Sequence, residues 1–230
     1  MGKAEALRLA VSAGNQLLTL AFAPPCAACG DPLDSPVDGC VCRKCWATIE
    51  PPPHVDWPSS ISVAAAAGDY IGSLRDIVHA LKYDGRRSLA RPLAARMRTR
   101  GSSMLHDADY VVPVPLHPWR HVRRGFNQAA DLAKALDLPL VHALWRKRMT
   151  TAQSGLSAAA RRRNVHGAFA LSPLLFRRRR DALLRDRVIV LVDDVRTTGA
   201  TLSSCAEILL EAGAREVRAL TAALRAVDRK

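Results

Sequence analysis

Two adjacent carboxylates, Asp193 and Asp194, stand where an apolar run gives way to a turn of hydroxyl residues and glycine. The run Val188–Val192 is short and β-branched, which is typical of a buried parallel strand. The turn at 197–201 precedes a helical pattern, so its N–H groups and hydroxyls would lie at a helix N-terminus, where an anion is stabilised. Paired carboxylates can bind vicinal hydroxyls, and the turn beside them can bind an anion. Together they predict a ribose 5-phosphate as the ligand. The alternative is an acidic strand end followed by an ordinary helix cap.

Five of the six cysteines fall between positions 26 and 45 and include two C-x-x-C pairs. Cys26 with Cys29, and Cys42 with Cys45, can each point two thiolates at one ion, which predicts a structural four-cysteine zinc ribbon. Metal binding would order a segment that is too small to bury a core of its own. Cys40 leaves the ligand set open, because it could replace Cys42. Unligated thiols or a redox C-x-x-C are the alternatives.

A basic segment follows the apolar stretch Tyr110–Pro115. Arg120, Arg123 and Arg124 precede a helical pattern that begins near Asn127. Guanidinium groups beside the free amides of a helix start suit a pyrophosphate group. A solvated surface loop is the alternative.

The string from Leu191 to Thr201 closely resembles the phosphoribosyl-pyrophosphate (PRPP) motif of type I phosphoribosyltransferases. The resemblance implies that the acid pair, Asp193 and Asp194, binds the ribose 2′- and 3′-hydroxyls. It implies that the 5′-phosphate is held by the loop residues Thr197, Thr198, Gly199, Ala200 and Thr201. In that family the arginine segment occupies the place of the pyrophosphate loop, and residues 146–169 occupy the place of the flexible loop that closes over the substrate.

The order of segments along nearly the whole chain is similar to the ComF family. The shared segments are the double C-x-x-C, Leu81-Lys-Tyr-Asp-Gly85, Val112-Pro-Val-Pro-Leu-His117, Arg123-Arg-Gly-Phe-Asn-Gln128, Gln153-Ser-Gly-Leu156 and the acid-pair string. ComF-like proteins are phosphoribosyltransferase-like, and some are associated with natural competence and DNA uptake. The resemblance also makes Lys82 a candidate pyrophosphate contact, with an ordinary surface lysine as the alternative.

Transfer of phosphoribosyl from PRPP to an acceptor would proceed through an oxocarbenium-like sugar, with Asp193 and Asp194 as the expected catalytic residues. Mg²⁺ bridging phosphate and ribose oxygens would assist, and the acid pair would help to position it. Adjacent strand residues face opposite ways, so we expect a bend at Asp193 if both carboxylates are to reach one ribose. In purine-salvage relatives a carboxylate stands at the position of Thr197, and threonine cannot act as that general base. A hypoxanthine- or guanine-type acceptor is therefore disfavoured, whereas orotate- or adenine-type chemistry stays open.

The acid pair, the anion turn and the basic residues must be positioned by the strands and helices that alternate along the chain. We expect strands within Ile61–Tyr70, Tyr110–Pro115, Leu140–Trp145, Ala168–Leu171, Val188–Val192 and Val217–Ala222, and helices over residues 4–22, Ser73–Tyr83, Ser88–Arg100, Asn127–Leu136 and from Leu202 to Gly213. This order predicts an α/β fold, a type I phosphoribosyltransferase-like parallel sheet with helices on both faces, plus a small N-terminal zinc ribbon. The proline-rich stretch 51–58 suggests two domains, 1–57 for the helix and ribbon and 58–230 for the α/β part.

The 230 residues carry 34 Lys and Arg against 21 Asp and Glu, a net charge of +13. Such an excess favours anionic partners, including single-stranded DNA or DNA-uptake machinery, although an arginine-rich solvated face would give the same count. Polar residues interrupt the N-terminal apolar stretch, and no run reaches the roughly 20 apolar residues of a membrane span. We expect a cytoplasmic protein, where paired cysteines more often bind metal than form disulfides.

Overall fold

The computed structural model describes residues 4–5, 10–14, 16–17, 24–117, 119, 122, 124–147, 167–175 and 182–226. The helix expected over residues 4–22 and the loop expected over 146–169 lie largely outside these ranges. Of the described helices, none is both long and apolar enough to cross a bilayer.

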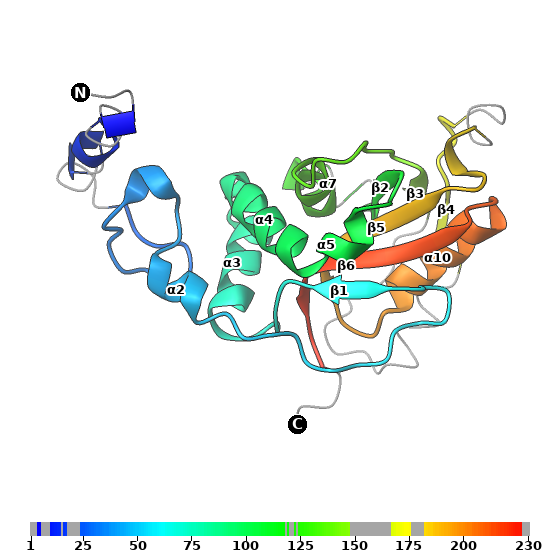
Figure 1. Cartoon of the computed structure of the whole chain (residues 1–230), viewed down its shortest axis with the longest axis horizontal. Helices are drawn as coiled ribbons and strands as arrows, with labels where there is room; N and C mark the ends of the chain where they lie inside the picture. Colours follow the sequence, from blue (N-terminus) through cyan, green and yellow to red (C-terminus); the bar gives the residue numbers. More distant parts are fainter. Residues whose placement is uncertain are drawn as a thin grey trace.

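A parallel four-stranded sheet forms the centre of the molecule (Figure 1). Its order is β1 (Ala64–Ala66), β6 (Glu216–Leu224), β5 (Val188–Arg196) and β2 (Tyr110–Pro113), and every neighbouring pair is parallel. The two long strands lie in the middle, where both faces are covered, and their near-continuous apolar sequence reflects that position.

Helices cover both faces of this sheet, as the sequence predicts. One face carries α3 (Gly72–Tyr83), α4 (Ala90–Arg100) and α7 (Gln128–Lys134), and the other carries α10 (Ala200–Glu211). The short elements η2 (Arg87–Leu89) and α5 (Ser102–Leu105) flank α4. Asn127 begins α7 by accepting a hydrogen bond from the Ala129 N–H at 3.1 Å, an N-cap that satisfies a free amide.

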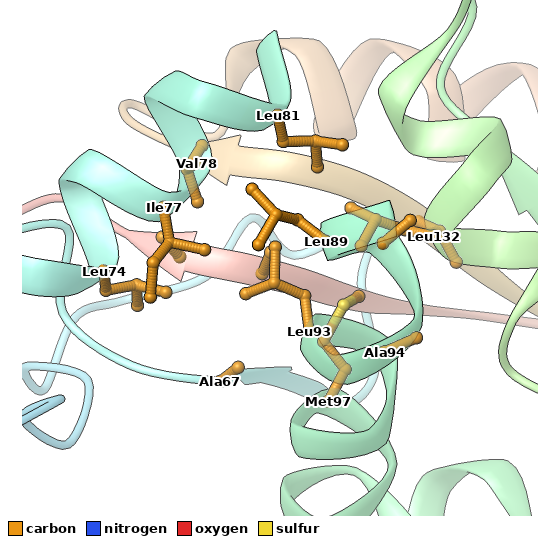
Figure 2. Packing of buried hydrophobic residues seen from close by; sticks show 14 of the residues in the cluster. Ala67, Leu74, Ile77, Val78, Leu81, Leu89, Leu93, Ala94, Met97 and Leu132 are labelled. Atoms are coloured by element: carbon orange, nitrogen blue, oxygen red, sulfur yellow. The ribbon is translucent and has the colours of Figure 1, made fainter. Parts of the chain in front are cut away.

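Leucines spaced by a helical turn hold the first helix layer to the sheet. Leu74, Ile77 and Leu81 of α3 pack with Leu93 and other residues of α4 in a fully buried cluster (Figure 2). Each such side chain contributes roughly 1.5–3 kcal/mol of burial energy. This packing fixes α3, whose last turn carries Lys82.

Alternate side chains of β5 pack against the two helix layers. Val190 and Val192 belong to the cluster under α3, whereas Ile189 and Leu191 belong to the cluster under α10. If this alternation continues, Asp194 faces the layer of α3 and Asp193 faces the layer of α10.

The stretch expected as a core strand, Leu140–Trp145, is only partly correct. Leu140 makes an isolated parallel bridge to Val111, and β3 (Leu144–Arg146) instead pairs antiparallel with β4 (Phe169–Leu171). A short apolar run does not specify its partner strand, so the sequence alone could not separate the two pairings. Within Ile61–Tyr70 only Ala64–Ala66 is strand, and β5 extends four residues beyond Val192.

The cysteine segment contains η1 (Pro36–Asp38) and α2 (Arg43–Ala47). Its buried residues, including Leu33, Cys45 and Ile49, belong to the same apolar cluster as α3. Gly68 lies directly against this segment, since a Cβ there would be 2.6 Å from Ile49 Cγ2 and 2.7 Å from the Glu50 carbonyl oxygen. The ribbon thus shares apolar packing with the element that carries Lys82.

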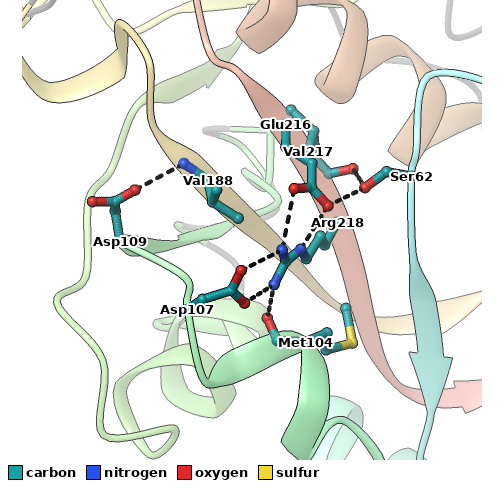
Figure 3. A network of polar contacts seen from close by, with 8 residues as sticks. All are labelled: Ser62, Met104, Asp107, Asp109, Val188, Glu216, Val217 and Arg218. Carbon is teal, nitrogen blue, oxygen red and sulfur yellow. Dashed lines mark hydrogen bonds and ion pairs between the residues drawn. The ribbon is translucent and has the colours of Figure 1, made fainter.

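Buried charge secures the amino-terminal edge of the sheet (Figure 3). Arg218 of β6 is 7% exposed and donates to Glu216 at 2.7 Å, to Asp107 at 3.0 Å and to the Met104 carbonyl at 2.7 Å. Nearby, Asp109 accepts from the backbone N–H of Val188 at 2.9 Å. At this edge Arg218 is therefore paired with two carboxylates of the described residues, Glu216 and Asp107.

Candidate functional site

The acid pair lies near the carboxyl end of β5, at the edge where ligands of open parallel sheets bind. The strand does not end before the pair, as expected, but continues through it to Arg196. Residues 197–199 then turn, and α10 begins at Ala200. The segment 197–201 therefore combines a tight turn with the first residues of a helix.

Asp194 forms an ion pair with Lys82 across two elements. The Lys82 Nζ lies 2.8 Å from Asp194 Oδ1, and the two side chains are 15% and 13% exposed. Burial of the Lys82 ammonium would lower its pKa, but the charge of Asp194, the hydrogen bond to Asp194 and the charge of Asp193 together outweigh burial and raise the pKa. Lys82 therefore stays protonated and places one fixed positive charge at the strand end.

Asp193 faces the other layer. Its charge acts on Cys205 of α10, and Arg146 of β3 acts on its carboxyl, which agrees with the alternation of β5. Burial, with the negative charge of Asp194 adding to it, raises the pKa of Asp193 to about 7. Its Oδ1 accepts the backbone N–H of Asp194 at 2.8 Å.

The bend expected at Asp193 is absent from the strand pairing, because β5 stays in register with β6 at Asp193, Val195 and Arg196. Asp193 pairs with Thr221, and Val195 pairs with Ala223. The two carboxylates thus occupy consecutive positions of a continuing strand, one toward each helix layer. A ligand that contacts both must sit across the end of the strand.

The turn after the strand, residues 197–201, is the predicted anion loop. Gly199 adopts a left-handed conformation with φ +77°, and a Cβ there would lie 3.2 Å from Pro58 Cγ, so two constraints require glycine. The Thr198 hydroxyl accepts the Ala200 N–H at 3.4 Å, a long contact. The loop thus presents hydroxyls and a helix N-terminus at one point.

Of the three predicted pyrophosphate arginines, the structure describes Arg124. Its guanidinium lies 4.9 Å from the centre of the Tyr83 ring, and its Nη1 donates to Gln128 Oε1 at 3.3 Å. Because Tyr83 follows Lys82, Arg124 lies against the end of α3, the helix that carries Lys82. Arg120 and Arg123 lie outside the described residues.

Two buried arginines at this site were not singled out from the sequence. Arg146 is 6% exposed and lies 5.1 Å from the centre of the Phe169 ring. Arg196, also 6% exposed, lies between the acid pair and the anion loop. Position alone could have flagged Arg196, since a basic residue there follows the acid pair and directly precedes the predicted anion loop. Nothing in the sequence indicates that Arg146 approaches Asp193.

The four cysteines of the two C-x-x-C pairs converge on one point. All four Sγ atoms lie within 4.8 Å of one another, with 3.9 Å between Cys26 and Cys45 and between Cys29 and Cys42. A tetrahedral zinc ion with Zn–S bonds of about 2.3 Å would separate its ligands by about 3.8 Å, so the cluster is compatible with zinc. Cys40 lies outside it, with its Sγ 3.6 Å from Ser88 Oγ.

Backbone amides favour a thiolate within the cluster. The N–H groups of Ala28 and Cys42 donate to the Cys26 sulfur at 3.4 and 3.3 Å. Burial of the Cys26 thiol would raise its pKa, but these and other backbone hydrogen bonds outweigh burial and lower the pKa to about 6. A thiolate at neutral pH is the form that ligates metal.

Comparison with known proteins agrees with this arrangement. The family described as "Phosphoribosyl transferase domain" matches residues 122–230, which include the acid pair and the anion loop. The chain is 35% identical over 188 residues to "DNA utilization protein YhgH" of Escherichia coli (strain K12), covering 77% of this chain and 74% of that protein.

Two further relatives carry names from natural competence. "Competence protein F" of Haemophilus influenzae is 36% identical over 163 residues, which cover 66% of this chain and 68% of that protein. "Competence protein ComFC" of Bacillus subtilis is 30% identical over 145 residues, which cover 63% of this chain and 56% of that protein.

The converging thiols predict different results for two neighbouring cysteines. Replacing Cys42 by Ser should abolish bound zinc and lower the melting temperature, because the remaining ligands cannot close a four-sulfur site. The matched variant Cys40→Ser should keep its zinc. Elemental analysis and thermal unfolding measure both. Zinc retained in Cys42→Ser but lost in Cys40→Ser would contradict this ligand set.

The raised pKa of Asp193 predicts that the ionised side chain destabilises the folded protein at high pH. The folded chain holds a proton there up to about pH 7, whereas the unfolded chain loses it near pH 4, so the free energy of unfolding falls as pH rises between these values. Asp193→Asn should be more stable than the wild type by about 2 kcal/mol at pH 8.5, and by much less at pH 5. Urea unfolding at both pH values measures this.

The exposed residue Asp76 provides the control for this comparison, because Asp76→Asn makes the same chemical change away from the site. It should leave the pH dependence of the wild type intact. An Asp193→Asn variant that is less stable than the wild type at pH 8.5, or equally stable at both pH values, would refute the assignment.

Proposed function

This chain belongs to the ComF family of phosphoribosyltransferase-like proteins, and from that premise we propose that it binds PRPP with Mg²⁺ at the end of β5 and transfers the phosphoribosyl group to an acceptor. The observation that carries the proposal is the succession of acid pair and anion loop, separated by two residues, on one continuous strand–turn–helix unit.

The 5′-phosphate is assigned to the loop Thr197–Thr201. The positive end of the α10 dipole and the backbone N–H groups of the turn favour an anion there. The threonine hydroxyls add further donors. The left-handed Gly199 lets the chain turn into α10 while its Cα packs against Pro58.

The ribose hydroxyls are assigned to Asp193 and Asp194, and the pyrophosphate to Lys82 and the arginine segment. Lys82 Nζ touches Asp194, so a pyrophosphate that arrives beside the ribose meets a charge already in place. Arg124 contributes a second cation from the neighbouring loop, and Arg120 and Arg123 remain predicted partners. Such preset charges stabilise a departing anion without reorganisation.

Mg²⁺ fits the donor set, because carboxylate and phosphate oxygens are the ligands it prefers. Bound with PRPP, it would neutralise part of the pyrophosphate charge. In the transfer, the bond from ribose C1 to the pyrophosphate oxygen breaks and a bond from C1 to an acceptor nitrogen forms. The pyrophosphate keeps the electron pair of the broken bond, and the acceptor nitrogen releases its proton to solvent.

The residue at position 197, a threonine, limits the kind of acceptor that we propose. Thr197 cannot take a proton near neutral pH, so we propose an acceptor that needs no carboxylate there, as in orotate- or adenine-type chemistry.

The proposal is tested by calorimetric titration with PRPP and Mg²⁺. Wild-type protein should bind, and Asp194→Asn and Lys82→Met should each raise the dissociation constant at least tenfold, because each removes a charge that faces the ligand. Glu207→Gln, on the exposed side of α10, is the matched control and should bind like the wild type. No binding by the wild type, or equal binding by Asp194→Asn, would refute the proposal.

A second function is favoured by the relatives' printed names and by the net charge of +13. We propose it as an accessory role in DNA uptake or use, through contact with single-stranded DNA. Trp119 and Trp145, which are 56% and 43% exposed, are the candidate stacking residues.

Binding to a labelled single-stranded oligonucleotide tests this second function. The affinity should fall steeply as salt rises from 50 to 200 mM, because each phosphate contact releases a counterion. Trp145→Ala should weaken binding further, whereas Leu210→Ala, an exposed apolar residue of α10, should not. Affinity that is absent at 50 mM salt, or indifferent to salt, would exclude the role.

A further inference from the structure

Arg196 is a buried cation directly before the anion loop. Its side chain is 6% exposed, and its guanidinium lies 4.9 Å from the centre of the Trp57 ring. Its Nη2 donates to the Asp56 carbonyl at 2.6 Å. Among the described residues, its Nε–H has no hydrogen-bond partner.

The surroundings of Arg196 differ from those of another strongly buried arginine, Arg218. Two carboxylates neutralise Arg218 at the amino-terminal edge of the sheet (Figure 3). The hydrogen bond of Arg196 goes to a carbonyl, which carries no net charge, and the exposed Asp56 is the carboxylate that attracts it. A buried charge without a close counter-ion is costly. Its retention inside a strand calls for a partner of opposite charge.

The position of Arg196 indicates where that partner binds. A Cβ on Gly199 would lie 3.4 Å from Arg196 Nε and 3.2 Å from Pro58 Cγ, so the guanidinium and the linker pack against the middle of the anion loop. Ser60 Oγ also lies 3.4 Å from Ser203 Oγ in the first turn of α10. Residues 56–60, which lead from the cysteine segment to the sheet, therefore line one side of the loop.

We infer that Arg196 is a positioning residue for the phosphate loop, and that it makes the linker 56–58 part of the phosphate site. The inference rests on the proposed function, because it takes the 5′-phosphate of the ligand as the missing counter-charge. Arg196 acts through the loop and without direct contact, since its buried Nε is sealed from solvent. It holds Gly199 against Pro58 and adds a positive charge behind the loop amides.

In this arrangement the linker 56–58 and the loop 197–201 both contribute to binding of the phosphate. Bending the linker away would remove the Asp56 carbonyl and the Trp57 ring from the guanidinium together. Loss of either contact would let the loop relax, so phosphate affinity depends on the path of the chain between the ribbon and the sheet.

The test compares ribose 5-phosphate binding by calorimetry in the wild type and three variants. Arg196→Met keeps the length and apolar packing of the side chain but removes its charge, and should raise the dissociation constant about tenfold. Arg196→Lys restores the charge and should recover most of the affinity. Trp57→Leu, which removes the stacking surface, should weaken binding by a smaller factor. Melting temperatures and zinc content are measured on every variant.

The melting temperature distinguishes a residue that positions the phosphate loop from one that only stabilises the fold. Since a buried unpaired charge is costly, Arg196→Met should melt at or above the wild-type temperature while binding more weakly. The control Arg187→Met removes one charge at the other end of β5, where Arg187 pairs with Asp109 at 2.9 Å, and should leave binding unchanged.

Three results would overturn the inference. One is wild-type affinity in Arg196→Met. Another is a loss of affinity that Arg196→Lys does not recover and that accompanies a fall in melting temperature. The third is failure of wild-type protein to bind ribose 5-phosphate at all, which would remove the proposed function as well. In the first two cases wild-type binding persists, so the proposed function stands.

Discussion

Two carboxylates at consecutive positions of a buried strand repel each other, and the site is organised around relieving that repulsion. Lys82 from α3 pairs with Asp194 on one side of the sheet, and Arg146 from β3 attracts Asp193 on the other. The apolar packing of α3 against α4 fixes the first cation. The antiparallel pair β3–β4 fixes the second. Elements on both sides of the sheet, the helix α3 and the strand pair β3–β4, therefore supply the cations at this strand end.

The two edges of the sheet handle charge differently. At the amino-terminal edge Arg218 is satisfied by Glu216 and Asp107, and Asp109 holds the start of β5. At the carboxyl edge Asp193 has a raised pKa, and the hydrogen bond of Arg196 goes to a carbonyl and not to a carboxylate. Proteins accept such local costs where a ligand supplies the missing charge. This contrast supports the proposed binding edge independently of any motif.

Sequence reasoning succeeded where local pattern decides structure. The apolar run before the acid pair, the glycine of the turn and the spacing of the C-x-x-C pairs specify their own geometry, and the fold class followed from the order of elements. It failed where distant partners decide. Leu140 and Trp145 belong to different pairings, and no local signal shows that Arg146 would approach Asp193 or that Cys40 would lie outside the thiol cluster.

The central claim is that the end of β5 grips a phosphorylated ribose. A crystal structure of the protein with ribose 5-phosphate measures this most directly. The account predicts the phosphate within hydrogen-bond distance of the 197–201 amides, and the 2′- and 3′-hydroxyls on Asp193 and Asp194. A sugar phosphate bound elsewhere, with Lys82 still closed on Asp194 and the loop empty at saturating ligand, would contradict it.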